Sequence, residues 1–189
     1  MDEHEPLRQR ARDYLRTRGT LASAAVIHER VGAALAALET FLDTVPAEVV
    51  ARQTIPGEWR IQEIADHLVE THRPGLDELR CLLAGQWPPG EPIPASLQSK
   101  APTLRPWPGL RAELKRVHDD ILRALAGVPA DFATEARAPL VMVINAPRPE
   151  GGVTPIQWVE ELDWKAYALV WRLHVLDHLN QAKKVLAAK

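Results

Sequence analysis

Residues 154–187 read TPIQWVEELDWKAYALVWRLHVLDHLNQAKKVLA, and no proline or glycine follows Pro155 in this stretch. Thr154 is a favourable helix N-cap, Pro155 suits the first helical position, and Gln157 completes a capping box. Apolar side chains recur at helical spacing from Leu162 onwards. The stretch therefore predicts one long helix from Thr154 to about residue 187, and the rest of the fold must pack against it.

Four segments upstream have the same three- and four-residue apolar spacing. They cover residues 6–18, 20–45, 60–84 and 109–126. Pro74 lies inside the third segment, so we expect a kink or a break there. Only Leu140–Ile144, LVMVI, suggests a strand. These patterns predict an all-α fold: a four-helix bundle with a proline-rich loop and a short strand or hairpin before the last helix.

The composition is that of an ordinary globular chain. Of 189 residues, 46% are hydrophobic and 25% are charged, and the formal net charge is −2. This balance lacks the basic excess of nucleic-acid-binding proteins, and no apolar run reaches the roughly 18 residues of a membrane-spanning helix. The charged N-terminus argues against a secretory signal, and the single cysteine, Cys81, has no internal disulfide partner. We expect a soluble cytoplasmic protein that acts on a small molecule, without nucleic acid or membrane as partner.

Proline marks the organisation of the chain. Seven of the 16 prolines lie between residues 86 and 108, which excludes a regular helix there. This loop, which contains Trp87 and Trp107, lines a substrate entrance or serves only as a semi-rigid connector. We expect one domain over residues 1–189, with a charged N-terminal helix at 1–19 and a core at about 20–187.

One pair among the seven histidines, His174 and His178, has the spacing of metal ligands. Side chains four residues apart on a helix lie one turn apart, so both imidazoles can bind one ion. At about 100° per residue, their face lies between the apolar stripe and the charged side of the helix. The same face carries aromatic and polar candidates for a pocket or for hydrogen bonds to the ligands: Tyr167, Trp171, Asp177 and Gln181.

His67, on the 60–84 segment, can supply a third nitrogen. It lies about 100° from the apolar stripe of its helix, on the side that also carries Glu63 and Glu70. Two such faces can meet in a bundle, and the carboxylates can then orient the rings. Three neutral imidazoles leave a metal with open positions, as in reactive centres. The pattern therefore predicts a metal site at His67, His174 and His178.

Each of these residues also has an ordinary structural explanation. A lone histidine such as His67 is usually a hydrogen-bonded packing residue, and Glu63 and Glu70 suit a solvated surface. Aromatic residues at helical spacing, as in the last helix, suit a bundle core better than a substrate cage. We expect packing or surface roles for the remaining histidines and the cysteine: His72 in the core, His4, His28 and His118 at the surface or in the core, and Cys81 buried.

Two segments together resemble the DinB/YfiT-like superfamily. Residues 57–59, GEW, followed by 63–68, EIADHL, resemble the entry to its second helix. Residues 174–181, HVLDHLNQ, resemble its last-helix pattern H-x-x-x-H-x-x-Q, and the likeness covers roughly residues 20–187. The resemblance implies an up-down-down-up bundle that holds a divalent metal through three histidines, here His67, His174 and His178.

The sequence departs from the family pattern at two places. Arg60 stands where many members have Ser or Thr, so Glu63 is expected to lack its usual capping partner. Leu179 and Asn180 replace the Arg-Gly that many members have before the glutamine. Neither change touches a predicted ligand, but both leave the subfamily and its activity undecided.

The resemblance also implies what such a site does, since members include thiol-dependent S-transferases and a maleylpyruvate isomerase. We expect a metal-dependent thiol S-transferase acting on a small electrophile, with a low-molecular-weight thiol as cosubstrate. The alternatives are a non-catalytic bundle for binding or scaffolding, with a structural metal or none, and a metal-assisted hydrolase with Glu63 or Glu70 as base. Imidazole ligands suit several ions. We expect zinc or nickel, with iron or manganese as alternatives, and a homodimer, since homodimers are common in the family.

Overall fold

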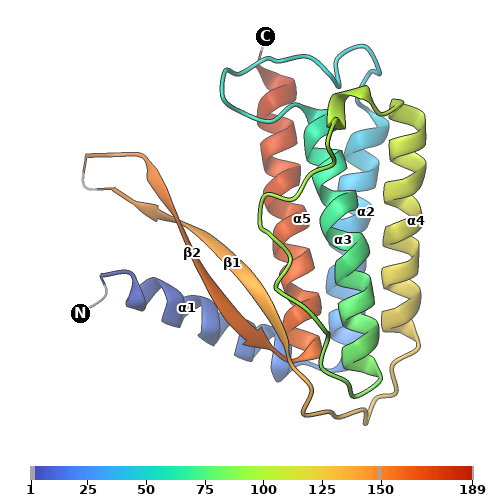
Figure 1. The fold of residues 1–189 in the computed structure, drawn as a ribbon, viewed down its shortest axis with the longest axis vertical. Coiled ribbons are helices and arrows are strands. Elements are labelled where there is room, and N and C mark those ends of the chain that lie inside the picture. The colour runs from blue at the N-terminus through green and yellow to red at the C-terminus, as the bar shows by residue number, and fades with distance from the viewer. Residues whose placement is uncertain (1–2, 149, 189) are drawn as a thin grey trace.

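The computed structural model describes residues 3–148 and 150–188 (Figure 1). Four long helices form the bundle: α2 (Ala24–Asp43), α3 (Ile61–Leu83), α4 (Trp107–Ala126) and α5 (Trp164–Ala187). Smaller elements surround it: α1 (Glu5–Leu15), a π-helical turn (Arg16–Thr20), a 3-10 turn (Pro102–Leu104) and the strands β1 (Ala138–Pro147) and β2 (Val153–Leu162). The described chain is therefore mostly helical, with an antiparallel hairpin before the last helix, which agrees with the predicted fold class.

The four bundle helices run up, down, down and up (Figure 1), as the resemblance implies. Helices α2 and α3 each pack against both α4 and α5. Because α3 and α4 point the same way, residues 84–106 must return along the length of α3, which is about 35 Å for its 23 residues. Extended proline-rich chain covers such a distance at about 3.1 Å per residue. The proline-rich loop is therefore a strap along the bundle, and we call residues 84–106 the strap.

The apolar faces of the helices meet in one core. Every bundle helix contributes fully buried side chains, among them Leu38, Leu68, Ile121 and Leu169. Gly75 of α3 faces α5, where an added β-carbon would lie 3.2 Å from the indole of Trp171. The missing side chain thus lets α3 and α5 approach closely at this level.

The prediction that the last helix begins at Thr154 is wrong. Residues 154–162 form most of β2, which pairs with β1 along its whole length. Val141 lies opposite Val159, and the hairpin thus joins β-branched side chains from two segments. A helix-start signal is local, whereas this strand is stabilised by hydrogen bonds to a partner strand earlier in the chain.

Helix α5 instead begins at Trp164. The side chain of Asp163 accepts hydrogen bonds from the backbone N–H groups of Lys165 and Ala166, at 2.9 and 3.0 Å. This is the ordinary N-cap arrangement, and it satisfies donors that the helix cannot pair internally.

Helix α3 continues unbroken through Pro74, so of the two predicted outcomes, a kink or a break, the break is wrong. An interior proline costs a helix about 3 kcal/mol. Helix α3 packs against both α4 and α5 and buries side chains on either side of Pro74. This tertiary packing outweighs the local cost.

Helix α1 and the hairpin lie beside the bundle and diverge from it (Figure 1). The Nε of Arg12 in α1 donates to Glu160 of β2 at 2.9 Å, which joins the two elements. Among the described residues, no single helix is long and apolar enough to cross a membrane. One pair of helices has sufficient combined length and apolar character: residues 5–20 together with α2. The two members of this pair meet at a bend of 113°.

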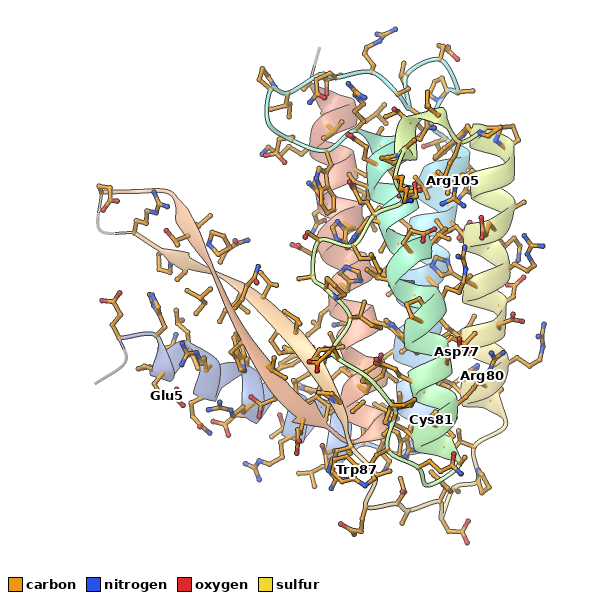
Figure 2. The ribbon with its side chains drawn as sticks, in the orientation of Figure 1. Glu5, Asp77, Arg80, Cys81, Trp87 and Arg105 are labelled. Atoms are coloured by element: carbon orange, nitrogen blue, oxygen red, sulfur yellow. The ribbon has the colours of Figure 1, made fainter. Side chains whose placement is uncertain are left out.

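The strap is anchored to α3 by a buried carboxylate. Asp66 is fully buried, and it accepts hydrogen bonds from the backbone N–H of Ser99 at 2.8 Å and from Arg105 at 2.7 Å. Gln62 adds a hydrogen bond from its amide to the Arg105 carbonyl at 2.7 Å. Figure 2 shows Arg105 where the strap reaches α3 near the end of its path. These contacts hold the second half of the strap against the N-terminal part of α3.

Asp66→Ala should lower the free energy of unfolding by about 1–3 kcal/mol, because it removes the buried carboxylate that accepts hydrogen bonds from the Ser99 N–H and from Arg105. Urea unfolding followed by circular dichroism measures the change. Asp77→Ala is the control, since Asp77 lies on the same helix, is exposed and pairs only at the surface with Arg80. Equal destabilisation by the two substitutions would contradict an anchoring role for Asp66.

Candidate metal centre

Helices α3 and α5 bring three imidazoles together. The Nε2 atom of His174 lies 2.9 Å from Nε2 of His67 and 3.0 Å from Nε2 of His178. One ring nitrogen from each of the three lies within 4.8 Å of the other two. The exposed fractions of His67 and His178 are 1% and 9%. The sequence-predicted triad is therefore a real cluster in the fold, and it lies largely out of solvent.

The outer nitrogens of two rings are held by acceptors. Nδ1 of His67 lies 2.8 Å from the carbonyl oxygen of Leu97 in the strap, so this nitrogen must carry the proton and donate. Nδ1 of His178 likewise donates to Oε1 of Gln181 at 2.9 Å. The Gln181 amide points its NH₂ group at Glu58, which fixes Oε1 toward the histidine. Both Nε2 atoms therefore present lone pairs to the centre of the cluster.

This donor set fits a divalent metal ion. The lone pairs on Nε2 of His67 and Nε2 of His178 both face Nε2 of His174. A single proton on Nε2 of His174 can form a good hydrogen bond to only one of these two nitrogens. A cation can accept lone pairs from all three rings. Metal–nitrogen distances of about 2.0–2.1 Å separate two ligand nitrogens by about 2.9 Å at an angle of 90° and by about 3.3 Å at the tetrahedral angle. The two separations from Nε2 of His174, 2.9 and 3.0 Å, are close to the first value.

The protein keeps the cluster uncharged. Burial, and to a smaller extent the neighbouring His178, lowers the pKa of His67 to about 4. Burial also lowers the pKa of His174 and His178, and their mutual proximity adds to the effect for His174. The imidazoles are therefore neutral at pH 7, which is the state in which they bind metals.

Different elements cover the two sides of the cluster. On one side the indole of Trp59 stacks on His178, with ring centroids 5.8 Å apart and planes at 9°, and also contacts His67. On the other side a cavity of about 680 Å³ lies between α5, α1, β1 and strap residues 93–95. His174 and His178 contribute to its wall. The cluster is therefore closed toward Trp59 and adjoins a cavity toward the hairpin.

The predicted neighbours of the triad lie in different surroundings. Tyr167, Trp171 and Asp177 line the cavity, and the first two are also buried in the core, as the aromatic spacing suggested. The Tyr167 hydroxyl donates to the buried Glu78 at 2.5 Å; burial raises the pKa of both groups. Gln181 contacts His178 of the triad directly, through Oε1.

Glu63 and Glu70 do not take part. Glu63 accepts a hydrogen bond from the Arg60 N–H at 2.7 Å, so it caps α3 even though Arg60 replaces the usual Ser or Thr. Glu70 pairs with Arg105 at 3.1 Å and helps to hold the strap. Neither lines the cavity. Cys81, expected to be buried, is only half-buried.

Sequence reasoning missed two histidines near the triad. His72 is fully buried, as expected, but its Nε2 lies 3.2 Å from Nδ1 of His174. His118, also buried, is 2.8 Å from Glu39 of α2 through Nδ1. Contacts between different helices create both arrangements, and no spacing along the chain signals them.

Between pH 7.5 and 4, the metal-free protein should lose stability, because burial lowers the pKa of His67, His72, His174 and His178. The pKa of His67 falls from 6.5 when unfolded to about 4 when folded, so the unfolded state binds more protons in this window. Its contribution is fully present above pH 6.5 and is lost as the pH falls toward 4. Urea midpoints of the wild type and His67→Gln should therefore converge or cross on acidification. Parallel pH profiles would contradict this.

Comparison with known proteins places the chain in a family. The family model described as the DinB superfamily matches residues 30–182, which span the bundle from α2 to α5 and all three clustered histidines. A search of curated proteins finds no match. The matched region covers most of the chain, and the protein is therefore a member of the DinB superfamily.

Proposed function

We propose that this protein binds a divalent metal ion through His67, His174 and His178 and uses it to activate a low-molecular-weight thiol for transfer to a small electrophile. The observation that carries the proposal is the convergence of three neutral Nε2 atoms beside a cavity. A purely structural ion needs no adjoining cavity of this size, whereas a reactive site must admit a substrate.

The reaction class follows from the family and from the donor set. A divalent ion held by three neutral imidazoles keeps open positions and would lower the pKa of a bound thiol. In the transfer, the thiol sulfur forms a bond to the electrophilic carbon. The leaving group departs with the electron pair of the bond that breaks, and the thiol proton passes to solvent.

The chain's own residues orient the ligands and exclude water. Leu97 and Gln181 accept hydrogen bonds from Nδ1 of their histidines and so aim each Nε2 inward. Trp59 covers one side of the cluster. Reactants are thereby restricted to the side of the hairpin, where Tyr167 and Trp171 form part of an apolar wall.

The alternative of a metal with only a structural role is supported by the burial of His67 and His178. Chelation separates the two roles. A structural ion should lower the melting temperature strongly when it is removed, whereas removal of a reactive ion should abolish turnover and leave most of the fold intact. Hydrolysis with Glu63 or Glu70 as base finds no support, since both carboxylates are engaged elsewhere.

His174→Ala tests the proposal, with His28→Ala as control because His28 lies on α2 outside the cluster. Zinc- and nickel-reconstituted proteins would be analysed for metal content and for transfer of a panel of thiols to 1-chloro-2,4-dinitrobenzene. Loss of a direct ligand should weaken metal binding by more than the roughly 10- to 100-fold typical of an outer hydrogen bond. Turnover should fall with it, while circular dichroism stays unchanged.

Full metal retention by His174→Ala would contradict the site. If His174→Ala loses metal but the metal-loaded wild type transfers no thiol, the protein is a metal-binding bundle and the transferase proposal is wrong.

A further inference from the structure

The wall of the cavity carries almost no charge. Apolar side chains from β1, α5 and strap residues 93–95 make up most of it, and its histidines are those whose pKa burial lowers. Among the described lining residues there is no lysine, arginine or glutamate, and Asp177 is the one formally charged side chain. The volume of about 680 Å³ lies within the range of small-molecule sites.

Two arginines lie near the cavity without lining it. Arg172 donates to the hydroxyl of Tyr14, a lining residue, at 3.2 Å, and Arg12 pairs with Glu160 and Glu5. An anionic ligand in the cavity would therefore lose its hydration without gaining a counter-charge from the described lining residues, and it would also lie near the Asp177 carboxylate.

We propose that the cavity selects an uncharged, largely apolar molecule and excludes carboxylates, sulfonates and phosphates. This inference deepens the proposed function, because the identification of the bound molecule as the electrophilic substrate rests on that function. In the proposed reaction, the metal site accommodates the anionic thiol sulfur. The apolar part of the electrophile packs against β1 and α5.

Two fluorescent probes that differ by one sulfonate test the charge preference: N-phenyl-1-naphthylamine, which is uncharged, and 8-anilinonaphthalene-1-sulfonate. The wild type should bind the uncharged probe more tightly. Val143→Lys places a cation on the cavity wall, at a position that is 42% exposed and can accept the change. This variant should bind the sulfonate roughly fivefold more tightly and the uncharged probe less tightly.

Val159→Lys is the matched control, since Val159 lies on β2 of the same hairpin, is 55% exposed and does not line the cavity. It should leave both affinities unchanged. Preference of the wild type for the sulfonate, or equal effects of the two lysines, would overturn the proposal. Probe binding requires no turnover, so failure of thiol transfer and failure of the charge preference are distinguishable.

A second inference starts from two unpaired nitrogens. Nδ1 of His72 and Nε2 of His118 are buried and have no hydrogen-bond partner, and the two rings lie with centroids 5.5 Å apart. Nearly all buried polar groups have a hydrogen-bond partner, and an ordered water supplies it where the protein offers none. At its far end His118 donates Nδ1–H to the carboxylate of Glu39, which leaves its Nε2 as an acceptor.

The tautomer of His72 depends on what His174 binds. Without a metal, Nε2 of His174 faces two lone pairs and must carry the proton, so its Nδ1 accepts from Nε2–H of His72. With a metal on Nε2, neutral His174 carries its proton on Nδ1 and donates to Nε2 of His72. The proton of His72 then resides on Nδ1 and points to the unpaired side.

We infer that metal binding moves the His72 proton from Nε2 to Nδ1, and that a buried water passes this hydrogen bond to His118 and Glu39. His72, His118 and Glu39 are then positioning residues that favour the metal-bound tautomer of His174. Arg111 holds the Glu39 carboxylate at 2.8 Å and completes the chain on α4.

Long-range ¹H–¹⁵N NMR distinguishes the two neutral tautomers directly. Titration with zinc should convert His72 from the Nε2–H to the Nδ1–H form, whereas His118 stays Nδ1–H throughout. Glu39→Met should weaken zinc binding severalfold in a chelator competition, and Glu39→Gln, which keeps an acceptor, should restore most of it.

Asp43→Met is the control, because exposed Asp43 also pairs with Arg111 but does not touch His118. An unchanged His72 tautomer on zinc binding, or equal zinc affinities of Glu39→Met and Asp43→Met, would overturn the inference. The tautomer is read without any assay of activity, so it does not depend on the transferase proposal.

Discussion

Three neutral imidazoles in a largely buried site, with Nε2 of His174 about 3 Å from Nε2 of both His67 and His178, are a demanding constraint. Lone pairs from His67 and His178 converge on His174, and water is largely kept away from them. Such an arrangement persists only if each ring is held from outside. Leu97, Gln181 and His72 supply those contacts, and every one of them comes from a different part of the fold.

The topology of the bundle makes this outer support available. Since α3 and α4 are parallel, the strap must travel back along the bundle, and this path carries the Leu97 carbonyl to His67. Buried Asp66, one residue before that histidine, fixes the strap through Ser99 and Arg105. The connection that sets the helix direction is thus also the connection that orients one of the three clustered histidines. Helix α1 and the hairpin complete the arrangement, because they enclose the cavity beside the other two histidines.

Much of the fold and the three clustered histidines could be predicted from the chain, because helical periodicity places side chains on faces. The i,i+4 spacing of His174 and His178 and the off-stripe position of His67 were sufficient to predict their convergence. The start of the last helix could not be predicted, since the signal at Thr154 is local and β1 overrides it. His72 was also missed as a neighbour of the triad. Five positions from His67 is about 140° around the helix, and only the packing of α5 against α3 brings its ring to His174.

X-ray absorption spectroscopy of the zinc-reconstituted protein is the most direct measurement of the metal centre. The account predicts one zinc per chain, with a shell of three imidazole nitrogens at about 2.0–2.1 Å and further light-atom ligands in the open positions. A protein that retains no zinc, or a zinc shell without imidazole scattering, would contradict it.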